Sequence, residues 1–372
     1  MHRIGSYQLF VMIVMFHIGS TPLFQLGSQA RQDSWIAVLI GAAGGAFVMA
    51  VFVALQRRKP EAGLVELLRL TVGRWPAVFF GLLYAAFFAY QSMRNVRDFG
   101  ELTSLSLLQN SPKWIIMGII VLIAWYTVMN GNEAFFRTTQ LLFIIVLGSY
   151  FLMGMVVLAM GLPDTRMLRP VLEHGPLPVF RAALPDIFSF PFTQGVIFLV
   201  FWKYAANRQA VRRTAYWGYA TGAVFIILMN ALIVSVLGPL STVSALPYLE
   251  VVQLVKVANF VERLDVVVTL LLFTGLYIKL TAFYFGAAIV IRELFSIPYA
   301  WGAAFIGVII YASSFAERNN TVHLWIGFGV SLRVSLVMQV GIPVALLLLA
   351  LVRIRGTERR RGGSTATEGK AG

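Results

Sequence analysis

Two short segments place glycine, proline and hydroxyl residues in the middle of long apolar runs. The first is residues 19–22 (Gly-Ser-Thr-Pro), and the second is residues 189–195 (Ser-Phe-Pro-Phe-Thr-Gln-Gly). Proline lacks a backbone N–H group and clashes with the preceding helical turn, so each segment is expected to interrupt a helix. Main-chain polar groups at an interruption within a membrane need a partner, and a small ligand can supply one. The chemistry that these segments predict is ligand binding.

The groups freed at such breaks suit a zwitterion. N–H groups at the start of a half-helix bind a carboxylate, and carbonyl groups at the opposite ends bind an ammonium group. We therefore expect an amino acid to contact small residues of the first segment and aromatic and polar residues of the second. These are Gly19, Ser20, Thr21, Phe190, Phe192, Thr193 and Gln194. The alternative is that the breaks are kinks that serve helix packing only.

Lys279 lies in the middle of another apolar run. An ionisable side chain within a membrane is expensive, so it is expected to be functional and to have a partner or an altered protonation state. It could hold two half-helices together, replace a coupling cation or carry a proton. The alternative is that it reaches toward the membrane surface, but it lies far from either end of the run. At the predicted site it would order the two breaks.

A second charged group lies within the run at residues 77–100 and just beyond its end. Arg97, Asp98 and Glu101 share one helical face at spacings of three and four residues. Together with Lys279 they are candidates for a polar seam along a water-filled path or for ion coupling. Two alternatives are an ion-pair network that locks helices together and the exposed outer end of a long helix.

A membrane-spanning scaffold must position these residues. The chain is 59% hydrophobic and only 12% charged, and its mean hydropathy is +0.79, whereas soluble domains are about 25% charged. A helix crosses a bilayer with about 20 apolar residues. We predict an all-α polytopic membrane protein with about ten spans. They lie at residues 7–27, 35–55, 77–100, 113–130, 137–160, 187–206, 215–238, 264–291, 297–316 and 331–353.

The two breaks fall in the first and sixth of these spans. Those positions correspond if the ten spans form a five-plus-five inverted repeat, which is typical of transporters with a site at broken helices. We predict a single transporter-like domain over residues 1–353, with repeat one at 1–160 and repeat two at 187–353. Residues 354–372 are predicted to form a disordered basic cytoplasmic tail.

Three connectors between the spans are long. Residues 56–76 predict a short amphipathic helix on the membrane surface, and residues 239–263 a short helix over the bundle. Residues 161–186 contain several prolines and predict an irregular loop.

The net charge of +14 is explained by short basic loops. Most lysines and arginines fall on the side of the N-terminus, which predicts that both termini are cytoplasmic and that the loops contact membrane lipid. This arrangement argues against nucleic acid as a partner. The chain has no cysteine and four scattered histidines, so no metal site is expected. No nucleotide-binding motif or nucleophile–base arrangement is found, so neither a cofactor nor enzyme activity is expected.

Several segments resemble, in their order and spacing, the spore germination permease family, the B subunits of bacterial germinant receptors. That family belongs to the amino acid–polyamine–organocation transporter superfamily. The resemblance implies ten spans with broken helices one and six and a site beside the breaks. The segments are residues 4–9, 16–20, 33–36, 190–195, 262–265 and 273–279.

The resemblance also implies a role and partners. The role is recognition of a small germinant, often an L-amino acid, in the spore inner membrane or the cell membrane. The implied partners are an A-type subunit with its own membrane spans and a lipid-anchored C-type subunit. Gln194 departs from the family, where this position is often acidic. Two other functions fit the same fold: a secondary amino-acid permease, proton-coupled or uncoupled, and a membrane scaffold with a vestigial site.

Overall fold

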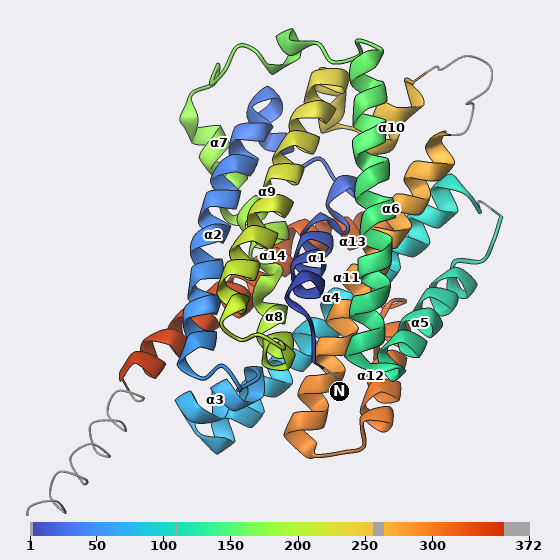
Figure 1. Ribbon diagram of the computed structural model, residues 1–372. Helices are drawn as coiled ribbons and strands as arrows, with labels where there is room; N and C mark the ends of the chain where they lie inside the picture. The colour runs from blue at the N-terminus through green and yellow to red at the C-terminus, as the bar shows by residue number, and fades with distance from the viewer. Residues whose placement is uncertain (1–2, 109, 256–263, 353–372) are drawn as a thin grey trace, which may run out of the picture.

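The computed structural model describes residues 3–108, 110–255 and 264–352, and it shows a bundle of helices (Figure 1). Two apolar helices, α5 (Lys113–Met129) and α12 (Tyr299–Ser313), have 17 and 15 residues. At 1.5 Å per residue they reach roughly 25 and 22 Å, somewhat less than the ~30 Å hydrocarbon core of a bilayer. Eight longer segments can cross a membrane by length and composition. They are Ser6–Leu23, Ser28–Arg58, Arg74–Ser106, Gly131–Ala159, Pro176–Tyr204, Ala210–Thr242, Val266–Phe295 and Asn320–Val352.

The ten segments correspond in order to the ten predicted spans, so the predicted all-α fold is confirmed. Several boundaries differ from the prediction, and the two largest errors are at the starts of the sixth and tenth spans. The sixth span begins at Pro176 and the tenth at Asn320, not at residues 187 and 331. The predicted tail at 354–372 lies outside the described residues.

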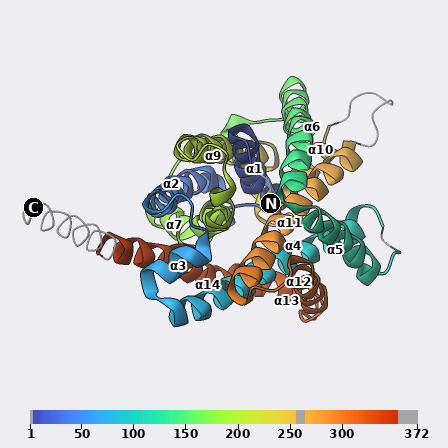
Figure 2. The ribbon, with the colours of Figure 1, turned by 60° about the horizontal axis from the view of Figure 1, so that its bottom comes forward.

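The helices divide into two groups, which Figure 2 shows on opposite sides of the bundle. The most extensive helix pair joins spans three and eight, and spans two and seven and spans four and nine also pack together. Corresponding members of two sets of five therefore contact each other, as expected for interlocked repeats. The helices are α1 (Ser6–Ile18), α2 (Ser34–Arg58) and α9 (Ala210–Leu237) in one group, and α4 (Arg74–Ser106), α5, α11 (Leu264–Phe295) and α12 in the other. The fifth span, α6 (Gly131–Ala159), lies at the edge (Figure 2).

The first span is broken where the sequence predicts. Helix α1 ends at Ile18, and Gly19 has φ 19° and ψ −112°, far from helical values. A single 3₁₀ turn, Thr21–Leu23, follows. Helix α11 packs directly on this break, since a Cβ atom at Gly275 would collide with the Gly19 carbonyl oxygen. A glycine on α11 thus permits close contact between a helix and the exposed main chain.

The sixth span is broken twice. Helix α7 (Pro176–Ala182) leads into the π-helical segment Ala183–Phe192, in which Leu184 (φ −124°, ψ 122°) and Phe190 (φ −136°, ψ 118°) are non-helical. The span continues through the 3₁₀ turn Gln194–Ile197 and helix α8 (Phe198–Phe201), and ends at Tyr204. The second break lies within the predicted segment 189–195.

The tenth span contains helix irregularities that were not predicted from the sequence. Helices α13 (Asn320–Ile326) and α14 (Leu332–Leu336) are separated by the π-helical segment Gly327–Ser331, and a second π-helical segment, Val337–Gly341, follows. The Arg94 guanidinium occupies the space where a Cβ atom at Gly327 would lie. Glycine here lets a charged side chain of α4 pack against the main chain of span ten.

Short helices cover the two ends of the bundle. Helix α3 (Leu64–Val72) lies at one end with buried leucines on its inner face, and α10 (Pro247–Gln253) packs over the bundle at the other (Figure 1). Both were predicted as short helices. The predicted loop at 161–186 is more ordered than expected, since it holds the turn Thr165–Leu168 as well as α7.

The N-terminus is attached to the end of span six. Ile4 forms an isolated parallel bridge with Ala205. The Ile4 N–H donates to the Tyr204 carbonyl, and the Ala206 N–H donates to the Ile4 carbonyl, both at 2.8 Å. The two broken spans are thus connected at the α3 end, where the N-terminus lies in Figure 1.

Candidate functional site

Lys279 lies between the two breaks. It extends from α11, is fully buried, and its Nζ is 3.3 Å from Ser20 Oγ in the first break. The same Nζ is 4.4 Å from the centre of the Phe190 ring in the second break and 5.6 Å from that of Phe16. One side chain therefore contacts both interruptions.

The ammonium group of Lys279 is poorly compensated. No carboxylate forms an ion pair with it among the residues that the structure describes, and its one hydrogen bond, to Ser20, is long. Burying an ammonium group without a counter-charge costs several kcal/mol. An anionic group placed beside Ser20 would remove much of this penalty.

Gly19 makes the close approach of Lys279 possible. A Cβ atom at this position would lie 3.0 Å from Lys279 Cδ and 3.0 Å from the Phe16 carbonyl oxygen. A larger residue would push the lysine stem away from the break.

A small polar cavity of about 40 Å³ lies beside the breaks. The first break contributes Ser20 and Phe24, and the second contributes Ser189, Phe190 and Gln194. The opposite wall comes from α4 and span ten. Its polar members are Gln91, Arg94, Asn95, Asp98, Ser331 and Ser335.

The seven residues predicted to contact a ligand lie on different sides of the breaks. Ser20, Phe190 and Gln194 line the cavity, and Gly19 lies against Lys279. The other three point elsewhere. The Thr21 hydroxyl donates to the His17 carbonyl at 2.7 Å, Phe192 packs on Tyr219, and the Thr193 hydroxyl donates to Gln339 Oε1 at 2.6 Å. Ligand contact stays a prediction for all seven.

Three aromatic rings separate this cavity from a larger one at the α10 end. The larger cavity has a volume of about 380 Å³ and is bordered by the loop before α10 and the end of α7. Phe24 lies 5.8 Å from Phe190 and 5.6 Å from Phe328, ring centre to ring centre. All three rings border both cavities. They form an aromatic layer at the boundary between the two cavities.

On the α3 side of Lys279, opposite the 380 Å³ cavity, packed side chains fill the space next to the lysine. Phe16 packs edge-on against Phe198 and Phe283, with ring centres 5.3 and 5.2 Å apart. Beyond these rings, Lys203 at the end of span six is paired with Glu293 of α11. The first and sixth spans are therefore held against α11 on the α3 side of Lys279.

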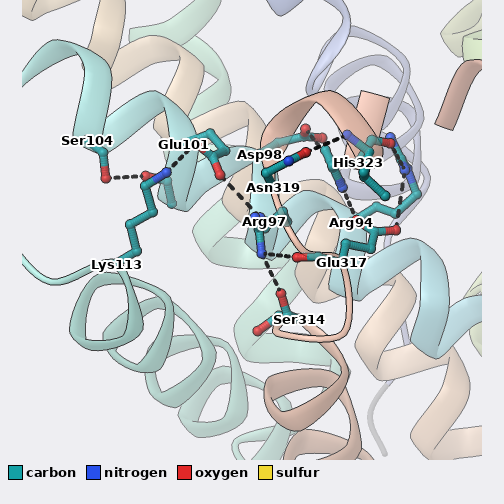
Figure 3. A network of polar contacts seen from close by, with 12 residues as sticks. Arg94, Arg97, Asp98, Glu101, Ser104, Lys113, Ser314, Glu317, Asn319 and His323 are labelled. Carbon is teal, nitrogen blue, oxygen red and sulfur yellow. Dashed lines mark hydrogen bonds and ion pairs between the residues drawn. The ribbon is translucent and has the colours of Figure 1, made fainter. Parts of the chain in front are cut away.

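The charged residues of α4 form an ion-pair network with the segment between spans nine and ten (Figure 3). His323 of α13 is fully buried and bonds Asp98 at 2.9 Å and Glu317. Arg94 donates to the His323 carbonyl at 3.0 Å. Span ten is thereby fastened to span three.

The three predicted seam residues have different places in this network. Arg97 is buried and donates to the carbonyls of Ser314 and Glu317, at 3.1 and 3.0 Å, at the end of α12. It also pairs with Glu101 at 3.2 Å, and Lys113 pairs with the other Glu101 oxygen at 2.6 Å. Asp98 and Glu101 border the 380 Å³ cavity, whereas Arg97 does not. The network therefore holds α4 against the end of α12, and it places two carboxylates beside the 380 Å³ cavity.

Asn95, Ser189, Ser331 and Ser335 line the inner cavity but were not predicted from the sequence. The sequence contains a pattern that could have identified Asn95. Gln91, Asn95 and Asp98 are polar residues at spacings of four and three in an apolar span, so they share one face of α4. Within the described ranges, no group of three or more histidines and carboxylates could hold a metal ion.

The helices and the two broken spans define a polytopic membrane protein with a transporter-like fold. Solved structures agree. The chain is similar to a nucleobase-cation-symport-1 family transporter, Mhp1, in a closed conformation with bromovinylhydantoin bound, with a TM-score of 0.64 and 12% identity over 93% of this chain and 78% of that one. It is also similar to a Na⁺-coupled sialic acid symporter in a substrate-bound outward-open state, with a TM-score of 0.62 and 12% identity over 95% and 79%.

Sequence comparisons identify the family. A family model described as "Spore germination protein" matches residues 3–322, so the chain belongs to that family. Spore germination protein KB of Bacillus subtilis (strain 168) is 30% identical over 97% of this chain and 98% of its own. Spore germination protein YndE of the same organism is 24% identical over 87% and 88%. The resemblance seen in the sequence is thus confirmed, and the chain is an integral membrane protein.

Proposed function

We propose that this chain is the membrane subunit of a germinant receptor and that it binds a small zwitterionic germinant, an L-amino acid, between the two breaks. The observation that carries the proposal is the buried Lys279 ammonium, which touches both breaks and pairs with no carboxylate in the described part of the chain. A ligand carboxylate beside Ser20 would compensate this charge. The N–H groups at the broken helix ends would add hydrogen bonds.

Binding is coupled to signalling through the packing of the bundle. The rings of Phe24, Phe190 and Phe328 lie between the inner and the 380 Å³ cavity, so a ligand that enters from the larger cavity passes these rings. A ligand shifts the balance between open and closed packings only by its difference in affinity for the two. Ligand contact with Phe190 would favour the closed packing and carry the signal to span ten.

The proposed orientation places the α3 end in the cytoplasm. That end carries the basic connector with Arg57, Arg58, Lys59 and Arg69, as the positive-inside rule requires. The 380 Å³ cavity then opens outward, where a germinant arrives. The proposed partners are an A-type and a C-type receptor subunit, which fits the membership of the spore germination protein family.

A secondary amino-acid permease, proton-coupled or uncoupled, is the second candidate. It is favoured by the similarity to two symporters and by cavities at both ends of the bundle. The cavity at the α3 end has a volume of about 850 Å³ and is lined by residues that include Arg69, Lys203 and Tyr299. Flux of labelled amino acid into proteoliposomes separates the two functions, since a receptor that only senses its ligand binds without net transport.

The test of the binding site is a thermal-unfolding screen of the purified protein against the common amino acids, sugars and nucleosides. We expect at least one amino acid to raise the melting temperature by preferential binding to the folded state. Gly19→Leu should abolish this shift, because the new side chain displaces Lys279. Gly148→Leu is the matched control, since a Cβ atom there meets nothing within 4 Å. If no amino acid stabilises the protein, the proposed ligand class is wrong.

A further inference from the structure

Three side chains that line the inner cavity each have a polar atom without a hydrogen-bond partner among the described residues. The atoms are Asn95 Oδ1, Ser189 Oγ and Gln194 Oε1. Their side chains belong to residues that are only 4%, 0% and 3% exposed. Buried polar atoms are almost always paired, because an unsatisfied one costs about 1–3 kcal/mol. Their concentration around one cavity indicates a partner bound within it.

The orientation of Asn95 is fixed by a neighbour. Its Nδ2 donates to the Gln91 carbonyl at 2.8 Å, so Oδ1 is the atom left to face the cavity. Gln91 is itself held, because its Nε2 donates to Ser335 Oγ at 3.3 Å. The cavity therefore presents a preformed acceptor from α4, before any ligand arrives.

The two sides of the cavity differ in their hydrogen-bonding character. On the α4 side, Asn95 offers an acceptor and Asp98 a carboxylate. The Arg94 guanidinium on the same wall is engaged by the His323 carbonyl and Glu317. Across the cavity, Gln194 of the second break adds an amide oxygen. On the side of the first break, Ser20 is the residue that contacts the Lys279 ammonium. A ligand with an N–H-rich cation at one end and an anion at the other matches this difference.

We infer that Asn95 and Gln194 recognise the primary ammonium group of the ligand, while its carboxylate faces Ser20 and Lys279. This inference rests on the proposed function and extends it by assigning the direction in which the zwitterion lies. It also brings a residue of span three, outside both breaks, into direct ligand contact.

The size of the cavity limits the ligand. A volume of 40 Å³ is room for about three water molecules. The closed packing therefore accepts the head group of an amino acid with at most a short side chain. Phe190 borders the cavity and excludes bulkier groups unless the aromatic layer opens. The ligand class is a compact amino acid such as glycine, L-alanine or L-serine.

The test compares each compact amino acid with its analogue that lacks the amino group: glycine with acetate, L-alanine with propionate, and L-serine with 3-hydroxypropionate. Affinities are measured by calorimetry on the purified full chain. A hydrogen bond to a charged group predicts that Asn95→Leu weakens amino-acid binding by about tenfold or more. Binding of the deaminated analogue should not change, since it has no group for Asn95. Gln194→Met should act in the same direction.

Two further variants separate recognition from folding. Asn95→Asp keeps an acceptor and adds a charge, so it should bind the amino acid at least as well as the natural chain. Gln56→Met is the matched control. Gln56 is equally buried and also has an unpaired Oε1, but its Nε2 bonds the carbonyls of Pro60 and Ala62 near α3. This control should leave the affinity unchanged.

The outcomes are distinct. If compact amino acids bind but Asn95→Leu and Gln194→Met bind them as the natural chain does, the inference is wrong and the proposed function stands. The same holds if Asn95→Leu weakens amino acid and analogue equally, which marks a packing effect. If only bulky amino acids bind, the size limit is wrong. If no amino acid binds to the natural chain, the proposed function and this inference fall together.

Discussion

Replacing Lys279 by methionine should weaken ligand binding strongly without lowering the stability of the ligand-free protein. The substitution retains a long unbranched side chain but removes the charge. Lys279 gains about 1 kcal/mol from its bond to Ser20 and about 2 kcal/mol from the Phe190 ring, yet it loses several kcal/mol of ammonium hydration. We therefore expect the free energy of unfolding to stay unchanged or to rise by up to about 2 kcal/mol.

The ligand-bound protein should respond in the opposite way. Removing one partner of a desolvated charge pair costs about 2–5 kcal/mol, which corresponds to a dissociation constant raised about 30-fold to several thousand-fold. Thermal unfolding gives the stability and calorimetric titration gives the affinity. Lys203→Met is the matched comparison. Since Lys203 pairs with Glu293, its loss should destabilise the protein by about 1–3 kcal/mol.

Two results would contradict this role of Lys279. One is a large loss of stability in ligand-free Lys279→Met, which would show that the ammonium group is well satisfied and structural. The other is unchanged affinity for an amino acid that binds the natural chain, which would show that its carboxylate lies elsewhere.

Two further substitutions test the scaffold around the site. Gly275→Ala should destabilise the protein by about 1–3 kcal/mol, because its Cβ atom meets the Gly19 carbonyl. The control Gly148→Ala on α6 should be neutral or slightly stabilising. Equal melting temperatures of the two variants would contradict the close packing of α11 on the first break. His323→Leu should cost about 3–5 kcal/mol, since the buried Glu317 and the partly buried Asp98 lose a shared partner. His323→Gln should recover part of that loss. An unchanged melting temperature in His323→Leu would show that the ion-pair network does not stabilise the protein.

The sequence predicts the breaks because their cause is local. Proline and glycine change the main chain at their own positions whatever surrounds them, so residues 19–22 and 189–195 could be found without a structure. Lys279 could be found for a similar reason, since a lysine in the middle of an apolar run is expensive in any fold. The ten spans follow from hydropathy alone.

The direction of each side chain at a break is not a local property. Thr21 and Thr193 have the residue type expected for ligand contact, but their hydroxyls bond the His17 carbonyl and Gln339. Leaving helical geometry changes the face on which each following residue lies, and no periodic rule covers that change. Sequence could therefore place the site along the chain but could not say which residues line it.

The far wall of the cavity depends on tertiary packing. Asn95 reaches the cavity because α4 lies across from the second break, and Ser331 and Ser335 reach it because span ten begins early and contains a π-helical segment. That segment starts at Gly327, against which Arg94 packs. Two residues more than 200 positions apart decide this geometry together, so the hydropathy pattern of either span alone does not reveal it.

The bridge between Ile4 and the end of span six consists of main-chain atoms only. Because neither hydrogen bond uses a side chain, the attachment can survive extensive sequence drift at positions 4 and 204–206. Proline is the exception at positions 4 and 206, since it has no N–H to donate. The two broken spans are therefore linked at their α3 ends by a contact that few substitutions can remove, so Ile4 belongs to the structural framework of the bundle.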